Sequence, residues 1–557
     1  MGIKGDAKNF LFDEFRTCFT RKHPRDTTVH LVSIDMMQYL KSTIPPNINS
    51  INAYVKYLVR QITSHLTAQN GCMVVVANFD LGSPIVKKLV THVNRYDKRC
   101  ALCKKTDSYS DTCVKDCINK QLLKYEDGPY LSGNSLPTKH NEWYRFAADS
   151  RNLRCELYPL IVNELLTVTC LRQGQQIVIN GLQFKTIKLS INDETWETGY
   201  CATVSTDRTR IIPWHPDDLP VKFVEKEYHR VFSIEAMPPS QAYPSGWLKI
   251  RDRPEMKNDI HEADNSVFFF SQFFPRHNQM IVINDGDAIP IGLLRVAEDY
   301  RGSRNPTHQT ILRLPNKSKS KKGILTPHKF DYVNLSKLYL DIMDYPKMKT
   351  AGVQNPVATF VFLIILAGTD FMKSFCPGIG NITEWKDDEK QYKRQRNGSW
   401  DTYFENMSEL SHMVQWLVWD MNPNPSTKRH IVVDRVAFRE FTYMCYRSKH
   451  LHDNPNASVE DIRVKCAKQK RVNYRLPSED TIDVWCQNSS WNLQYWVNAC
   501  RDIYIDPFEQ ENNTSFWGFD KNGITASVSS DERFVDEKYK LHFYENVKKS
   551  IKRHKKG

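Results

Sequence analysis

Short apolar runs that end at acidic residues dominate the hydrophobic pattern of the first hundred positions. Residues 28–34 (TVHLVSI) predict a buried strand, and Asp35 follows it directly. Residues 73–76 (MVVV) predict a second strand that leads through Ala-Asn-Phe to Asp80. Between them, residues 51–66 carry one apolar stripe at helical spacing. This order predicts a parallel pair of strands joined by a right-handed crossover, which places both aspartates at one sheet edge.

The stretch at residues 261–289 (HEADNSVFFFSQFFPRHNQMIVINDGDAI) contains two pairs of carboxylates, each written as acid-x-acid. Glu262 and Asp264 stand at the start of a predicted helix, whereas Asp285 and Asp287 follow a predicted buried strand. Ligands bind at the carboxyl ends of strands in open α/β sheets. Four carboxylates that converge there repel one another unless a divalent cation neutralises them, and Mg²⁺ prefers such oxygen ligands. The alternative is two solvated charge pairs at the ends of a helix and a strand.

Asp370 is a further acid that follows an apolar element. Residues 356–366 (PVATFVFLIIL) predict a buried helix, which is followed by Ala-Gly-Thr-Asp. An aspartate directly after a strand more often caps the next helix, so Asp35 and Asp80 have that ordinary role as an alternative. Their repetition after successive strands favours a shared metal site. The candidate metal ligands are Asp35, Asp80, Glu262, Asp264, Asp285, Asp287 and Asp370.

A basic amphipathic helix is predicted at residues 83–99 (SPIVKKLVTHVNRYDKR), with Ser83 as its N-cap and a proline in its first turn. Lys87, Lys88 and Arg95 lie on or near one face of this helix. Because the helix starts beside the predicted carboxylate cluster, these cations could hold a scissile phosphate against bound metal ions. The alternative is a solvated basic face.

Four cysteines follow within eighteen positions, at Cys100, Cys103, Cys113 and Cys117. Four thiolates at such spacing can close a tetrahedral structural zinc site. The chain has 14 cysteines scattered along its length, so a set of unrelated free thiols is the alternative.

The composition of the chain limits which class of protein it can be and which partners it favours. The chain has 557 residues, enough for several domains, and 40% of them are hydrophobic. Its 77 basic and 64 acidic residues give a net charge of +13, which favours an anionic partner. The longest apolar run, residues 357–368, is shorter than the ~20 residues that a membrane span needs. The first ten positions are polar and charged, so we expect a soluble intracellular protein with free thiols and no membrane partner.

Two glycine- or lysine-rich segments suggest contacts with phosphate groups. Residues 376–380 (CPGIG) form a predicted tight turn, in which the backbone at Gly378 and Gly380 can approach a phosphate or coordinate an ion. A plain helix–helix turn is the alternative. Residues 548–557 (KKSIKRHKKG) contain no acid and read as a phosphate-binding or nuclear-targeting segment, or as a solvated terminus.

Six blocks together resemble the flap endonuclease/XPG family of structure-specific 5′ nucleases. They are MGIKG at the start, VSIDMMQYL, VANFDLGSP, HEAD, NDGD and LAGTDF with the following GIG. All six stand in the family's order and cover about the first 390 residues discontinuously. Each block alone is weak, whereas the set is fairly specific.

The resemblance implies an α/β fold, with a PIN-like, mostly parallel sheet flanked by helices, and two Mg²⁺ or Mn²⁺ ions held by the seven acids. It implies that Lys87 or Lys88, together with Arg95, corresponds to the cations of the family's basic helix. It matches CPGIG to a helix-two-turn-helix that grips duplex DNA with a potassium ion, and it places Gly2 beside the active site. The implied regions are two halves of a nuclease core at 1–99 and 254–384, an insertion with the cysteines at 100–253, and a C-terminal region at 385–557.

Some positions depart from the family pattern. Asp6 replaces an apolar residue, and Asn-Ile-Thr follows the GIG where the family has proline and basic residues, which weakens the expectation of potassium binding. About 160 residues separate the basic helix from HEAD, which implies an inserted subdomain. Divergence of this kind with a retained MGIK start resembles flap-nuclease-like proteins of large DNA viruses, which implies a location in the nucleus or at viral replication sites.

The sequence therefore predicts a metal-dependent 5′ nuclease that cuts branched or single-strand-ended DNA at flaps, junctions or ends, in replication, repair or recombination. One alternative is a 5′→3′ exoribonuclease of the same superfamily. The other is a non-catalytic nucleic-acid-binding scaffold that retains the fold. The presence of all seven acids argues against the scaffold, since a scaffold needs none of them.

Overall fold

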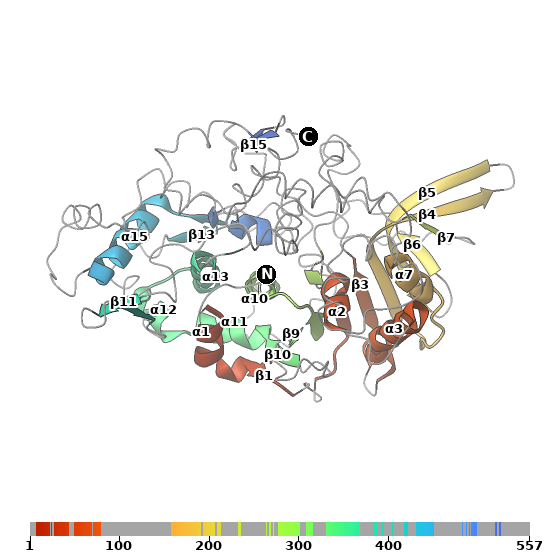
Figure 1. Ribbon diagram of the computed structural model, residues 1–557, viewed down its shortest axis with the longest axis horizontal. Coiled ribbons are helices and arrows are strands. Elements are labelled where there is room, and N and C mark those ends of the chain that lie inside the picture. Colours follow the sequence, from red (N-terminus) through yellow and green to blue (C-terminus); the bar gives the residue numbers. More distant parts are fainter. Residues whose placement is uncertain are drawn as a thin grey trace. The chain divides into compact units, whose positions relative to one another are not determined.

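Figure 1 shows the computed structural model of the chain. The structure describes residues 7–22, 24, 27–43, 50–68, 71–79, 157–190, 193–205, 209–212, 232–235, 263, 267–268, 271, 277–300, 308–315, 330–367, 369, 383–386, 391–394, 404, 417–420, 431–450, 482, 486, 489–490, 492–497, 519–520 and 523–524. Contacts divide the chain into two units, each described separately. One comprises residues 1–19, 286–306 and 334–548, and the other comprises residues 20–285, 307–333 and 549–557.

A ten-stranded sheet with the order β1-β10-β9-β8-β2-β3-β4-β5-β6, in which β7 also pairs with β4, organises the second of these units. Its central strands run parallel, in the pairs β9–β8, β8–β2, β2–β3 and β3–β4. The pairs β4–β5, β4–β7 and β5–β6 are antiparallel. The strands are β1 (Phe19–Thr20), β2 (Leu31–Asp35), β3 (Val74–Asn78), β4 (Gln176–Ser190), β5 (Asp193–Ser205), β6 (Thr209–Ile212), β7 (Phe232–Glu235), β8 (Gln279–Val282), β9 (Thr310–Pro315) and β10 (Phe330–Asn334).

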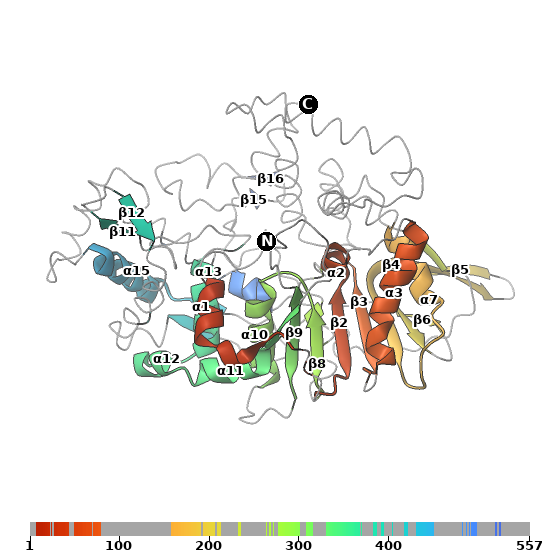
Figure 2. The ribbon, with the colours of Figure 1, turned by 60° about the horizontal axis from the view of Figure 1, so that its bottom comes forward.

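The predicted α/β class with a mostly parallel sheet flanked by helices is confirmed. Helix α2 (Met36–Ser42) starts where β2 ends, and α3 (Ile51–Thr67) leads back to the start of β3. Figure 2 shows β8, β2 and β3 side by side, with α2 continuing from the upper end of β2. The predicted strand, helix and strand of the first hundred positions are therefore observed.

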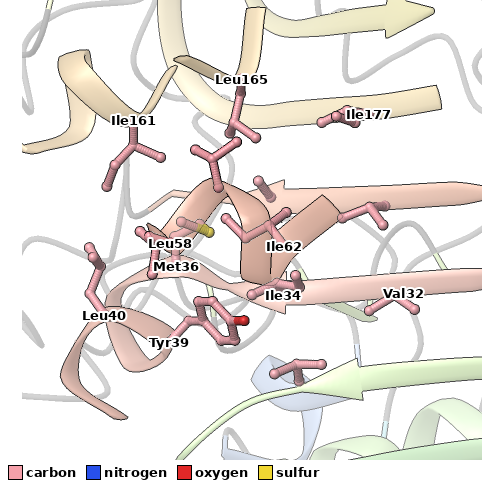
Figure 3. Close-up of a cluster of buried hydrophobic side chains, with 14 of the residues drawn as sticks. Val32, Ile34, Met36, Tyr39, Leu40, Leu58, Ile62, Ile161, Leu165 and Ile177 are labelled. Carbon is pink, nitrogen blue, oxygen red and sulfur yellow. The ribbon is translucent and has the colours of Figure 1, made fainter. Parts of the chain in front are cut away.

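An N-cap fixes where helix α3 starts, and an apolar stripe determines which face of the helix is buried. Ser50 Oγ accepts a hydrogen bond from Ala53 N at 3.2 Å, which satisfies one of the amides at the start of the helix. One face of α3 and α7 (Tyr158–Leu166) packs on one face of the sheet, as Figure 3 shows for Leu58, Ile62 and Leu165. These helices and the sheet share one cluster of buried hydrophobic residues. Along each strand, the residues of this cluster alternate with residues on the opposite face of the sheet, because successive side chains of a strand point to opposite sides. They include Val32, Ile34, Val75, Ala77, Ile177, Ile179, Met280 and Val282.

A long hairpin extends the sheet beyond its parallel part. Strands β4 and β5 pair over most of their length, with an irregularity between Asn180 and Phe184, and they project as the long yellow ribbon in Figure 1. These strands, with β6 and β7, fall within the insertion expected at residues 100–253, yet they hydrogen-bond onto the central sheet through β3. The four predicted regions themselves stay a prediction.

The other unit is mainly helical and is built around α13 (Pro356–Leu366). Every residue of α13 is buried, as the apolar run predicted, and it packs against α10 (Ala288–Asp299) and α11 (Leu335–Met343). Aromatic rings surround its start, with ring centroids of Phe15 and Phe360 5.7 Å apart. The further elements are α1 (Ala7–Glu14), η1 (Arg16–Cys18), α12 (Pro346–Ala351), α15 (Arg435–His450) and the hairpins β11–β12 (Thr383–Lys386, Gln391–Arg394), β13–β14 (Val418–Asp420, Ile431–Val433) and β15–β16 (Phe519–Asp520, Gly523–Ile524).

Among the described helices, only one bent pair has the length and composition of a membrane span. No single one of them is long and apolar enough to cross a bilayer. The segment Leu335–Ala351 with Pro356–Leu366 reaches that length and composition only as a pair bent by 84°.

Candidate functional site

Two buried aspartates follow neighbouring parallel strands at the same edge of the sheet. Asp35 is the last residue of β2, and Asp285 comes three residues after the end of β8. These strands pair in parallel, with Ile34 opposite Val282, so both acids lie towards the carboxyl end of the strands. Asp35 is 1% exposed and Asp285 is 7% exposed. The described part of the chain therefore places two of the predicted metal ligands at the expected edge.

Asp287 is a third buried acid, two positions further along the chain. It is 6% exposed and precedes the first residue of α10. Its carbonyl oxygen accepts a hydrogen bond from Ile291 N at 3.1 Å, whereas its carboxylate does not cap the helix. The partial positive charge at a helix N-terminus favours an anionic side chain at this position.

Burial of three carboxylates is unusual and needs compensation. Aspartate is almost never fully buried unless it is paired, because removing a carboxylate from water costs several kcal/mol. Asp35, Asp285 and Asp287 are each more than nine-tenths buried. Oxygen ligands of this kind fit a hard divalent cation such as Mg²⁺. The carboxylates of Asp35 and Asp285 are therefore of the type that the predicted metal chemistry needs.

Asp35 also has the ordinary role that its position allows. Its Oδ1 accepts a hydrogen bond from Gln38 N at 3.0 Å and so caps α2. The alternative interpretation as a helix cap is thus correct for this oxygen atom. The same bond restricts rotation of the carboxylate, which is useful for a metal ligand because it fixes the direction in which the group points.

Three buried polar side chains continue this edge across the next two strands. Asn78 ends β3 opposite Asp35, and Asn180 lies on β4 opposite Asn78. Asn78 Nδ2 donates to Ser33 Oγ at 2.9 Å, and Asn180 Nδ2 donates to Asn78 Oδ1 at 3.0 Å. All three side chains are fully buried. They were not among the predicted site residues, although an asparagine at the end of each apolar run, VVVAN and QIVIN, was a visible signal.

Two amide oxygen atoms near this edge lack hydrogen bonds. Within the part of the chain that the structure describes, no donor reaches Asn180 Oδ1 or Asn284 Oδ1, and both atoms are buried. Asn284 directly precedes Asp285. A buried acceptor without a partner costs about 1–3 kcal/mol. A ligand, a cation or a water molecule that bound to either oxygen atom would therefore lower the free energy of the folded protein.

Tyrosines near α2 are poor candidates for acid–base chemistry. Burial raises the pKa of Tyr39 to about 12 and raises that of Tyr54 well above its ordinary value. Tyr54 Oη donates to Thr43 O at 2.9 Å. Both phenols therefore stay neutral near pH 7.

Most other predicted site residues lie outside the described residues. Described and buried neighbours of these residues include Phe79, which precedes Asp80, and Ala263, which stands between Glu262 and Asp264. Thr369, which precedes Asp370, donates from Oγ1 to Asn492 Oδ1 at 3.0 Å. The predicted residues outside the description are Gly2, Asp80, Lys87, Lys88, Arg95, Cys100, Cys103, Cys113, Cys117, Glu262, Asp264, Asp370, Gly378 and Gly380.

The described residues alone do not assemble a complete metal site. Among them, no group of three or more histidine, cysteine, aspartate or glutamate side chains is arranged to hold a metal ion. Four of the seven predicted acids fall outside that set. The seven-acid site and the four-cysteine zinc site therefore stay predictions.

The fold and the strand-end residues define a mixed α/β protein with an acidic and amide-rich edge on its parallel sheet. Models of known protein families gave no match to the sequence, and no functionally characterised protein matched it significantly. The strand-end carboxylates and amides are therefore the basis for assigning a function.

Proposed function

We propose that this chain is a divalent-metal-dependent 5′ nuclease that cuts branched or single-strand-ended DNA. In this proposal the parallel sheet is the PIN-like core of a flap-endonuclease-like fold. The observation that carries the proposal is the burial of Asp35 and Asp285 after the neighbouring parallel strands β2 and β8. The order of the six sequence blocks supports it.

The carboxylates would hold the metal ions, and the basic helix would hold the substrate. Bound Mg²⁺ or Mn²⁺ supplies a water of lowered pKa and offsets charge on the attacking and leaving oxygens of a phosphodiester. Asp35 presents a carboxylate whose rotation the Gln38 amide restricts. Lys87 or Lys88, with Arg95, would offset the charge of the scissile phosphate.

The test is the double variant Asp285→Asn/Asp287→Asn. An amide keeps the shape of each side chain but removes the negative charge that binds the cation, so cleavage should fall at least ~1,000-fold while DNA binding survives. Cleavage is measured with Mg²⁺ on labelled flap, nicked, hairpin and single-stranded DNA, and binding is measured with Ca²⁺.

Asp344→Asn is the matched control for this experiment. Asp344 is 76% exposed and pairs with Lys349 at 2.7 Å on the surface, so its substitution should leave cleavage unchanged. A double variant that cuts every substrate at the rate of the unmodified protein would overturn the proposal.

A 5′→3′ exoribonuclease is the second candidate. The stretch PVATFVFLIILAGTDF also resembles that group, and its apolar part forms the fully buried α13, which ends four residues before Asp370. Matched RNA and DNA flaps of one sequence separate the two activities. Preferential cleavage of the RNA flap would favour the exoribonuclease.

A further inference from the structure

Three buried polar side chains on β2, β3 and β4 form one continuous hydrogen-bonded row. Asn78 is at its centre. Its Nδ2 donates to Ser33 Oγ at 2.9 Å and to Ile34 O at 3.2 Å, and its Oδ1 accepts from Asn180 Nδ2 at 3.0 Å. We call Ser33, Asn78 and Asn180 the amide row. It crosses three neighbouring strands, β2, β3 and β4.

The orientation of both amides is fixed by a backbone carbonyl. Ile34 O can only accept a hydrogen bond, so the group of Asn78 that faces it must be the NH₂. The Asn78 oxygen then faces β4, and Asn180 must present its own NH₂ to it. As a result Asn180 Oδ1 is left at the far end of the row, where the described residues offer it no donor.

Fold stability does not explain the amide row. The other residues of β3 are valine and alanine, and an aliphatic side chain in the row would leave no buried acceptor without a partner. A fully buried polar network that ends in an unsatisfied oxygen is less favourable than an apolar core. The row therefore indicates a task other than packing.

The amide row acts on the backbone that carries Asp35. Ile34 O belongs to the peptide group whose nitrogen is that of Asp35, so the bond from Asn78 holds this peptide plane. On the other side, Gln38 N holds the Asp35 carboxylate. Asp35 is therefore fixed at both its backbone and its side chain.

We propose that the amide row is a positioning device for Asp35, which sets the carboxylate for metal binding. Ser33, Asn78 and Asn180 are positioning residues and not catalytic ones, since they act through the backbone at Asp35. This inference rests on the proposed function as a metal-dependent nuclease. It adds β3 and β4 to the elements that determine how the strand-end site performs.

The test removes the entire row at once in Ser33→Ala/Asn78→Val/Asn180→Val. All the side-chain partners disappear together, so the midpoint of thermal unfolding should change by no more than ~5 °C. The affinity for Mn²⁺, measured by titration calorimetry, should fall at least ~10-fold. The kcat for DNA cleavage should fall by a similar factor, while KM for DNA stays constant.

Thr63→Val is the matched control. Thr63 is buried on α3, where its Oγ1 donates to Val59 O at 2.9 Å, so this variant loses a buried polar group without affecting Asp35. Should the triple variant fail to fold, Asn180→Leu removes only the end of the row and the unsatisfied oxygen. This single variant is expected to lower Mn²⁺ affinity by a smaller factor than the triple variant.

The outcomes separate this inference from the proposed function. Unchanged Mn²⁺ affinity and kcat in the folded triple variant, or in Asn180→Leu if the triple variant does not fold, overturn the positioning role and leave the nuclease proposal intact. An unmodified protein that neither binds Mn²⁺ nor cuts any substrate overturns both. An equal loss in Thr63→Val would show a general packing effect and would also overturn the positioning role.

Discussion

Asp299 shows how burial alone changes the chemistry of an acid in this protein. It lies in the last turn of α10, beside Arg295 and Glu298, and its side chain is 4% exposed. Burial raises the pKa of Asp299 from 3.8 to about 6, and the attraction of Arg295 only partly opposes that shift. The carboxyl group is therefore stabilised in its protonated form relative to the unfolded chain.

The first prediction at this scale concerns pH dependence. Because the folded pKa of Asp299 is raised, its contribution to stability is fully present below pH 3.8 and is lost as the pH rises through about 6. Asp299→Asn removes this dependence. The difference in unfolding free energy between the two proteins should change by about 2–3 kcal/mol from pH 4 to pH 7, measured with urea. Parallel stability curves would contradict the assignment.

The second prediction concerns thiol reactivity. Burial raises the pKa of both Cys18 and Cys72 to about 12, and Cys18 Sγ also donates to Asp341 Oδ2 at 3.1 Å. Only the thiolate is nucleophilic, so both should resist iodoacetamide at pH 8, whereas the exposed Cys170 should react. Peptide mass spectrometry measures this, with urea-unfolded protein as the control in which all three react. Alkylation of native Cys18 as fast as Cys170 would refute it.

At the scale of single residues, the sequence predicted acids better than amides. Asp35 and Asp285 were identifiable because each stands at a fixed distance after a local apolar run. Asn78 and Asn180 were not, because their roles depend on partners 45 and 102 positions away. The cap formed by Asp35 was foreseeable as an alternative, since it involves only a residue three positions on.

At the scale of elements, helix α12 ends at a position whose backbone conformation only glycine adopts easily. Gly352 has a φ of 76°, in the left-handed region. Its amide donates to Lys349 O at 3.0 Å, and Val353 N donates to Met348 O at 3.2 Å, which is the Schellman pattern of hydrogen bonds. A Cβ at this position would meet no atom within 4 Å, so the only obstacle to a side chain is the backbone conformation.

A third prediction follows for this helix end. Gly352→Ala should lower the free energy of unfolding by about 1–2 kcal/mol, because an L-residue is strained at this φ. Gly352→Asn should cost less, since asparagine enters the left-handed region more readily. Thermal unfolding of the two variants checks the order. An alanine variant as stable as the unmodified protein would contradict the conformational argument.

The elements that the sequence predicted correctly are those with a local signal. Helices α3 and α13 follow from an apolar stripe and an unbroken apolar run, and β2 and β3 from short apolar runs beside them. The long hairpin of β4 and β5 lacks such a signal, because alternation identifies a strand but not its partner. The pairing of β4 with β3 depends on hydrogen bonds between segments about 100 positions apart.

At the scale of the whole molecule, the α/β class was predictable, whereas the order of the strands was not. Alternation of strands and helices indicates a parallel sheet. The order β9-β8-β2-β3-β4 places late strands beside early ones, and no local pattern encodes such neighbours. The acidic edge at Asp35 and Asp285 exists because of that order, which places the end of β8 beside the end of β2.

The pairing of β2 with β8 also has a consequence for the time at which the site is assembled. Ile34 and Val282 face each other although they are about 250 positions apart. At a synthesis rate of 5–20 residues per second, β2 leaves the ribosome about 10–50 s before β8. Throughout that interval the growing chain contains Asp35 but not yet Asp285. A nascent chain of this protein thus passes through about half of its translation before the acidic edge can form.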